Sequence, residues 1–162
     1  MKYSDEIEKY ILDCDGSTRD ITFTPIPLNS LLEFLGIILN IFEPASISDN
    51  EGDSIDTNFQ AIQRALLLPS GYIHGTFTSD KAAVTSIDIF IDWDEKGEFA
   101  VELSFFPRNI NLKCYSLQSF MSQVEEWWKI LGSKTVFIRY ENASWSLYDK
   151  EGLGVFFYCE NV

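Results

Sequence analysis

Residues 87–106, IDIFIDWDEKGEFAVELSFF, decide the fold, because apolar and polar side chains alternate along two runs separated by a short turn. This alternation is typical of strands that are buried on one face only, so the stretch predicts a β-hairpin. The apolar rows of the two strands are Ile87, Ile89, Ile91 and Trp93, followed by Phe99, Val101, Leu103 and Phe105.

The turn between the two runs sets the register of the hairpin. A three-residue loop, 95–97, places Trp93 opposite Phe99 and Asp94 opposite Glu98, whereas a two-residue loop would put the two apolar rows on opposite faces. Gly97 supplies the left-handed residue that the longer loop uses. We therefore expect the first register, in which five carboxylates share the polar face: Asp88, Asp92, Asp94, Glu98 and Glu102.

This polar face carries an energetic cost. Like charges directly opposite each other destabilise an antiparallel pair by roughly 0.2–1 kcal/mol. Phe90 falls on the same face by alternation, so an apolar side chain lies among the carboxylates. An apolar anchor with a charged rim is typical of a protein–protein interface.

Other elements follow from the same kinds of pattern. Strands are expected at 7–14, 19–24, 72–78, 134–148 and 153–159, and helices at 30–42, 57–67 and 116–131. Ser30 and Thr57 show capping-box spacing, and Gly132 is a natural helix stop. Helical spacing places Trp128 in the core stripe of the last helix and leaves its neighbour Trp127 partly exposed. Residues 43–58 are expected to form an acidic loop.

These elements predict a single domain spanning residues 1–162. Its fold class is α+β, with a mainly antiparallel sheet of six or seven strands and two or three helices packed on one face. The acidic side of the hairpin is then expected to lie on the uncovered face.

Charge restricts the partners. The 162 residues carry 25 acidic and 12 basic side chains, a formal net charge of −13. Direct binding to nucleic acid or to an anionic membrane is disfavoured, because both need clustered Lys and Arg. A basic protein partner is favoured, because long-range attraction speeds association. The N-terminal stretch has no apolar signal-peptide region and the most apolar run, 31–42, is too short to span a bilayer, so we expect a cytoplasmic protein.

The sequence shows no catalytic motif. His74 is the only histidine, and neither a GxSxG elbow, a P-loop nor a GxGxxG loop is present. We expect no enzymatic activity and no cofactor. A carboxylate-dependent hydrolase remains an alternative, since two acids of the hairpin could serve as acid and base.

The acidic loop resembles a calcium-binding loop only in part. Asp49, Glu51 and Asp53 alternate, but Gly52 stands at position 4 and Gln60 at position 12, where the loop requires Gly at 6 and a bidentate Glu at 12. We therefore expect no metal. The candidate binding residues are Asp88, Phe90, Asp92, Asp94, Glu98 and Glu102, with Asp49, Glu51, Asp53 and Asp56 as a secondary acidic surface.

Two stretches resemble a known class of proteins. CDGSTRDITFTPIPLNSLLEFL, residues 14–35, and EFAVELSFFPRNI, residues 98–110, resemble segments of small bacterial immunity proteins that are partners of polymorphic or contact-dependent toxins. The resemblance implies a non-catalytic cytoplasmic protein that binds one cognate toxin. Arg19 and Asp20 match the "RD" of the first segment, and a structural role as an ion pair or backbone cap is expected for them. The alternative is a nucleic-acid mimic that blocks a basic protein without a cognate toxin.

Overall fold

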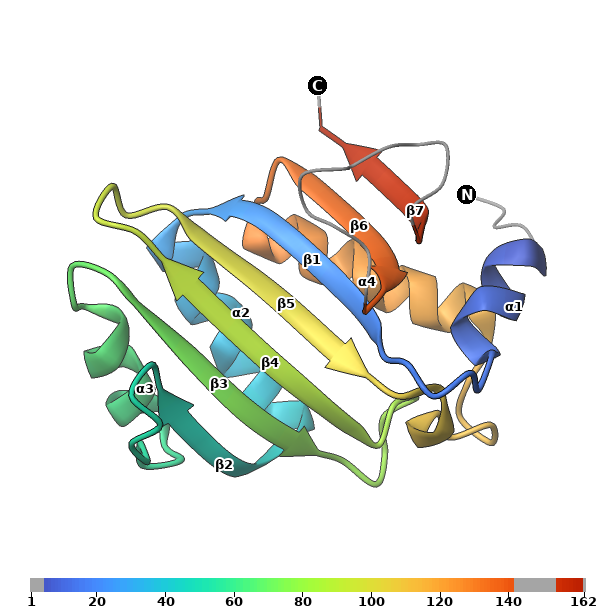
Figure 1. The fold of residues 1–162 in the computed structure, drawn as a ribbon, viewed down its shortest axis with the longest axis horizontal. Helices are drawn as coiled ribbons and strands as arrows, with labels where there is room; N and C mark the ends of the chain where they lie inside the picture. Colours follow the sequence, from blue (N-terminus) through green and yellow to red (C-terminus); the bar gives the residue numbers. More distant parts are fainter. Residues whose placement is uncertain (1–4, 142–153, 162) are drawn as a thin grey trace.

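The computed structural model describes residues 5–141 and 154–161. Within these residues, seven strands form one antiparallel sheet in the order β2-β3-β4-β5-β1-β6-β7 (Figure 1). In chain order the elements are α1 (Asp5–Leu12), β1 (Arg19–Ile26), α2 (Leu28–Ile41), β2 (Glu43–Asp49), α3 (Phe59–Leu66), β3 (Gly71–Thr78), β4 (Ser86–Trp93), β5 (Phe99–Phe105), the 3₁₀ turn η1 (Pro107–Asn109), α4 (Leu117–Leu131), β6 (Thr135–Tyr140) and β7 (Val155–Glu160).

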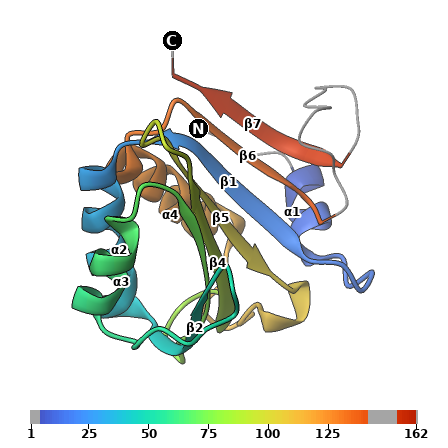
Figure 2. The ribbon, with the colours of Figure 1, turned by 60° about the vertical axis from the view of Figure 1, so that its left-hand side comes forward.

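The helices form a layer on one side of this sheet. Figure 2 shows α2, α3 and α4 on the same face, and α1 beside one end of β6 and β7. The ring of Tyr10 in α1 contacts Tyr140 and Phe156, at centroid distances of 6.2 and 5.6 Å. The predicted α+β class, the seven antiparallel strands and the one-sided helices are confirmed, with one helix more than expected.

The hairpin of β4 and β5 has the predicted register. Trp93 lies opposite Phe99, and the pairs Ile91–Val101 and Ile89–Leu103 follow. The turn closes with hydrogen bonds from the Asp94 and Gly97 amides, and Gly97 adopts a φ of 75°. The apolar row therefore faces the helices, and the polar row faces away from them.

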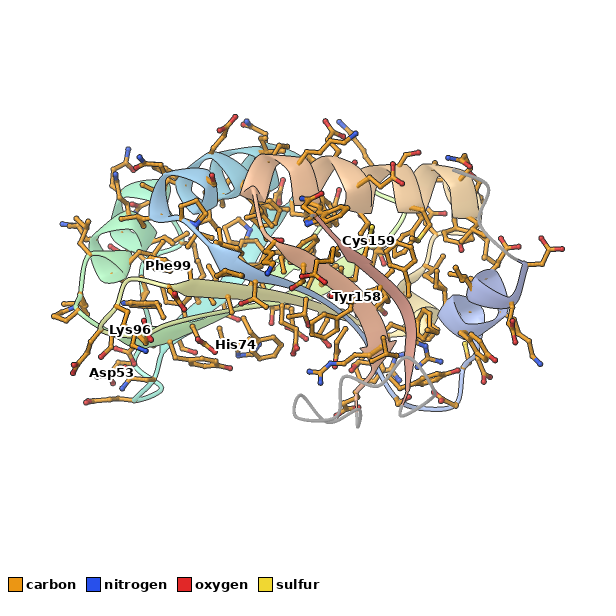
Figure 3. All side chains as sticks on the ribbon, turned by 90° about the horizontal axis from the view of Figure 1, so that it is seen from above. Asp53, His74, Lys96, Phe99, Tyr158 and Cys159 are labelled. Atoms are coloured by element: carbon orange, nitrogen blue, oxygen red, sulfur yellow. The ribbon has the colours of Figure 1, made fainter. Side chains whose placement is uncertain are left out.

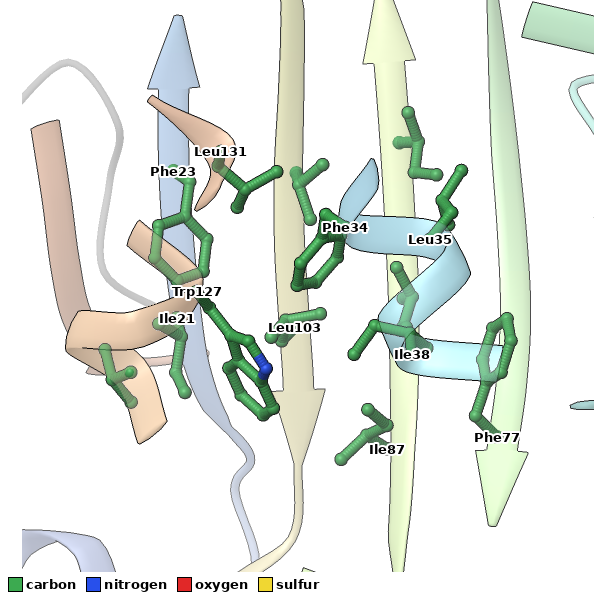
Figure 4. Close-up of a cluster of buried hydrophobic side chains, with 14 of the residues drawn as sticks. Ile21, Phe23, Phe34, Leu35, Ile38, Phe77, Ile87, Leu103, Trp127 and Leu131 are labelled. Carbon is green, nitrogen blue, oxygen red and sulfur yellow. The ribbon is translucent and has the colours of Figure 1, made fainter. Parts of the chain in front are cut away.

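The core fills the space between this apolar row and the helices. Figure 4 shows Phe34, Leu35 and Ile38 of α2 and Trp127 of α4 above the sheet residues Ile21, Phe23, Phe77, Ile87 and Leu103. Trp127 is buried and meets Phe34 edge to face, so the predicted partial exposure of Trp127 is wrong. Trp128 is only half-buried and donates its indole N–H to the Ser133 carbonyl at 2.8 Å. Both tryptophans fit helical spacing after Val124, at three and four residues, so the pattern alone could not separate them.

The N-terminal segment differs from the prediction. Residues 7–14 were expected to form a strand, whereas Asp5–Leu12 form α1. Ile7 and Ile11 are four residues apart and Ile11 is fully buried, which is the spacing of one helix face. Acidic side chains at Asp5, Glu6 and Glu8 favour a helix start, because they complement the positive end of the helix dipole.

Three further boundaries differ. The expected acidic loop 43–58 begins instead as the edge strand β2, in which only Ile47 is buried. Helix α2 begins at Leu28, so Ser30 lies inside it rather than at its start. Asn58, not Thr57, caps α3 by accepting the Ala61 amide at 2.9 Å. Helix α4, with Ser116 as its N-cap and Gly132 as its C-cap, agrees with the predicted helix 116–131 and its stop at Gly132. The parts of the two last predicted strands that fall on 142–153 lie outside the described residues.

Candidate binding surface on the open face of the sheet

The face of the sheet opposite α2, α3 and α4 carries the predicted polar residues. Figure 3 shows His74 on this open face, on the side of the sheet away from α2 and α4. Strand pairing aligns three rows across it, and each row runs from β3 through β4 to β5. The rows are Tyr72–Asp92–Ala100, His74–Phe90–Glu102 and Thr76–Asp88–Ser104, and the last two continue into Thr22 and Asp20 of β1.

One half of the open face is an ion-pair network, formed by Asp20, Thr22, Glu102, Ser104 and Arg139. Arg139 Nη2 lies 2.8 Å from Glu102 Oε2, and Arg139 Nε lies 4.0 Å from Asp20 Oδ2. Ser104 donates to Asp20 at 2.7 Å, and Thr22 donates to Glu102 at 3.2 Å. The Arg139 and Asp20 side chains are each 5% exposed and Glu102 is 20% exposed, so this polar group is internal to the fold.

Burial shifts the pKa values of the carboxylates in this network. Burial raises the pKa of Asp20 and of Glu102, and the neighbouring guanidinium of Arg139 opposes both increases. Breaking one partner of such a group leaves the others buried and uncompensated. Glu102, which the sequence places in the binding set, is therefore held by Arg139 of β6 as part of the fold.

The other half of the open face is an aromatic hollow, lined by Tyr72, Phe90, Asp92, Ala100, Val101 and Glu102, with a volume of about 290 Å³. The Phe90 ring stacks on His74, with centroids 4.5 Å apart and planes 5° from parallel. The Tyr72 ring lies 6.2 Å from Phe90. Phe90 is thus held by ring contacts with His74 and Tyr72. The rings of Tyr72 and Phe90 together form one wall of the hollow, from which Phe90 does not project alone.

The carboxylates around this hollow differ in their contacts. Asp88 accepts a hydrogen bond from Thr76 at 2.6 Å and lies 3.4 Å from His74 Nε2. Asp92 is exposed over much of its surface, and the burial of the remainder, together with the charge of Asp94, raises its pKa. Burial and then the charges of Glu102 and Asp92 raise the pKa of Tyr72, so both carboxylates act on the same phenol.

The turn of the hairpin resolves the predicted repulsion between Asp94 and Glu98. Asp94 Oδ1 accepts the Lys96 amide at 2.9 Å and the Glu98 amide at 3.3 Å. The Asp94 carboxylate therefore caps its own turn. These two hydrogen bonds offset the repulsion between Asp94 and Glu98.

The secondary acidic surface lies at the same end of the sheet as this turn. Asp49 pairs with Ile73, which pairs with Ile91 near the end of β4. Asp49 Oδ1 accepts the amides of Glu51 and Asp53 at 2.9 and 3.0 Å, which orders the loop that also holds Asp56. Figure 3 shows Asp53 and Lys96 at this same end. The structure thus brings together two acidic segments that the sequence presents separately.

Sequence reasoning missed Tyr72 and Arg139 as parts of this face. Alternation places Ala100 on it, but sequence reasoning gave Ala100 no binding role. Tyr72 and His74 alternate within the predicted strand 72–78, but their neighbours depend on which strand pairs with it. The structural role expected for Arg19 is present: the buried guanidinium caps the Tyr10 carbonyl at 2.6 Å and pairs with Asp15 at 3.3 Å.

Two further properties bear on function. Within residues 5–141 and 154–161, no group of three or more His, Cys, Asp and Glu side chains is arranged to hold a metal ion. No helix in the same part of the chain has the length and apolar character to cross a membrane.

The fold and the open face define a class: a small α+β domain with helices on one side of an antiparallel sheet and an acidic, aromatic surface on the other. The same fold occurs in a chain of the 1.75 Å crystal structure of the toxic C-terminal tip of CdiA from Pseudomonas aeruginosa in complex with immune protein. The TM-score is 0.51 with 15% identity, and the match covers 88% of this chain and 94% of the other. No protein-family model and no curated relative matches the chain.

Proposed function

We propose that this chain is an immunity protein, which neutralises a cognate toxin by stoichiometric binding in the cytoplasm and catalyses no reaction. The fold it shares with a chain of a toxin–immune protein complex supports this proposal. The stretches 14–35 and 98–110, which resemble immunity proteins, support it independently.

The observation that carries the proposal is the division of the open face. The network carboxylates Asp20 and Glu102 pair with Arg139, whereas Asp92, Asp94 and Glu98 have no ion-pair partner within the described residues. A row of uncompensated carboxylates beside an aromatic hollow fits a partner with a basic surface. A basic surface is typical of a toxin that cleaves nucleic acid, because its substrate is a polyanion. An acidic inhibitor reaches that surface quickly and excludes the substrate.

Two alternatives use the same residues differently. A nucleic-acid mimic would bind a basic protein through the same acidic face, but it would have no toxin gene beside its own. A carboxylate-dependent hydrolase needs two convergent acids, one of them in an apolar pocket. Glu102 is instead bound by Arg139, and Asp88 by Thr76, so the geometry favours binding over hydrolysis.

Co-expression in cells tests the proposal. Any toxin domain encoded directly upstream of this chain's gene is expressed with the wild-type chain, and growth is measured. We expect growth to be restored by the wild type and not by a variant with Asp92→Lys, Asp94→Lys and Glu98→Lys. The matched control carries Asp5→Lys, Glu33→Lys and Glu126→Lys, which change the net charge equally on the helices.

Each outcome has a definite meaning. Protection by the wild type and by the helix control, together with loss in the open-face variant, supports both function and surface. Full protection by the open-face variant would contradict the surface. Growth arrest caused by this chain alone, or no protection by the wild type, would contradict the function.

A further inference from the structure

The aromatic hollow lies over Ala100, the smallest side chain in its row. Ala100 lies opposite Asp92, and Asp92 lies opposite Tyr72 on the next strand. The neighbouring row presents Phe90 and Glu102, which are much larger. The small side chain at Ala100 leaves room in a hollow of about 290 Å³ that two rings and two carboxylates also line. A larger residue at position 100 would therefore reduce this space.

The chemistry of the lining selects a cation. One wall is the faces and edges of Tyr72 and Phe90, and the rim carries Asp92 and Glu102. Glu102 is already paired with Arg139, whereas the Asp92 carboxylate has neither a hydrogen-bond nor an ion-pair partner among the residues that the structure describes. An aromatic wall beside a carboxylate attracts a cationic group through both the ring quadrupole and the charge.

The protein itself combines arginine with aromatic rings and carboxylates at other places. The Arg19 guanidinium lies 4.1 Å above the Tyr140 ring while it pairs with Asp15. Arg108 lies 4.3 Å above the Phe106 ring. A planar guanidinium can stack on a ring and form two parallel bonds to a carboxylate, and a lysine ammonium cannot do both.

We propose that the aromatic hollow receives an arginine side chain of the toxin, which stacks on Tyr72 and Phe90 and pairs with Asp92. This inference rests on the proposed function and names the group that the partner supplies. It also changes the role of Phe90, which the sequence indicates as an anchor that enters the partner. Stacked on His74, Phe90 is instead part of the receiving wall.

A variant that fills the hollow without changing charge tests the inference. Ala100→Leu places a larger side chain in the hollow, and Ser122→Leu adds the same group to α4 at an exposed position in the helix layer. We expect Ala100→Leu to raise the dissociation rate of the toxin complex by at least about tenfold, as loss of a central contact does, with association nearly unchanged. Ser122→Leu leaves both rates unchanged. Wild-type dissociation from Ala100→Leu would overturn the proposal.

A second measurement separates this inference from the proposed function. N-acetyl-arginine amide is titrated into the isotope-labelled wild-type chain, and the amide signals of Phe90 and Ala100 are followed by NMR. We expect these signals to shift in the wild type, to shift less with N-acetyl-lysine amide, and to stay in place in Ala100→Leu. An absence of shifts with the arginine compound would overturn the hollow as an arginine site, even if the chain protects against a toxin. Shifts without protection would leave the hollow in place and contradict the immunity function alone.

Discussion

Both halves of the open face carry carboxylates, but the two halves differ in how these carboxylates are partnered. Around β1, β5 and β6, two carboxylates share one guanidinium, and the three side chains are mostly buried. Around β3 and β4, the carboxylates stay half-exposed, with Asp88 37% and His74 38% exposed. A charged residue on a sheet therefore indicates a binding site only after its neighbours across the strands are known.

The largest effect is expected in the ion-pair network. Arg139→Met leaves Asp20 and Glu102 buried without their cation, which typically costs about 3–5 kcal/mol. Chemical unfolding monitored by circular dichroism measures the change. A loss below about 1 kcal/mol would mean that this half of the face is not structural, and the comparison between the halves would fail.

A pair of neighbours on β4 gives the next largest contrast. Ile89 is 1% exposed toward the helices, and Ile89→Ala should cost about 2–5 kcal/mol because it leaves a cavity in the core. Phe90→Ala on the open face should cost only about 1 kcal/mol, chiefly the stacking on His74. Equal losses in the same unfolding experiment would show that the hollow is needed for folding, and would count against its role as an exposed binding surface.

The pH dependence of stability should differ between the halves as well. Burial and the neighbouring Asp20 carboxylate raise the pKa of Glu102, so the folded protein takes up this proton at a higher pH than the unfolded chain. The free energy of unfolding of the wild type, minus that of Glu102→Gln, should therefore increase as the pH is lowered from about 7 toward the ordinary carboxyl range near 4. Urea unfolding of both proteins across this range measures the difference, and a decrease on acidification would contradict the buried assignment.

The smallest effect is expected at Asp92. Asp92→Asn removes a charge that has no partner within the described residues and relieves repulsion from Asp94. The free energy of unfolding should change by no more than about 0.5 kcal/mol, and the change should be an increase. A marked loss in the thermal unfolding of Asp92→Asn would show that this carboxylate, like Glu102, serves the fold.

The hairpin could be predicted from the sequence because its residues determine it locally. Alternation with period two and a glycine at position 97 allow one register that buries both apolar rows, and the structure has it. The segment around Ile7 and Ile11 could not be assigned in this way, because its short apolar pattern fits a strand as well as a helix.

The ion-pair network lay beyond sequence reasoning for a different reason. Asp20, Glu102 and Arg139 are far apart in the chain and meet only because β1 lies between β5 and β6. The hairpin pattern places Glu102 on the open face but does not give the strand order. The hollow could not be predicted for the same reason, because Tyr72 comes from β3 and Ala100 from β5, and their proximity depends on the strand order.

The salt dependence of toxin association tests the central claim most directly. The association rate constant of the upstream toxin domain is measured by stopped flow at increasing salt, for the wild type and for the variant with Asp92→Lys, Asp94→Lys and Glu98→Lys. If the uncompensated half of the open face attracts a basic toxin, the wild-type rate falls steeply with salt, while the variant is slow at low salt and nearly insensitive to it. Equal rates and equal salt dependence for the two proteins would contradict the account.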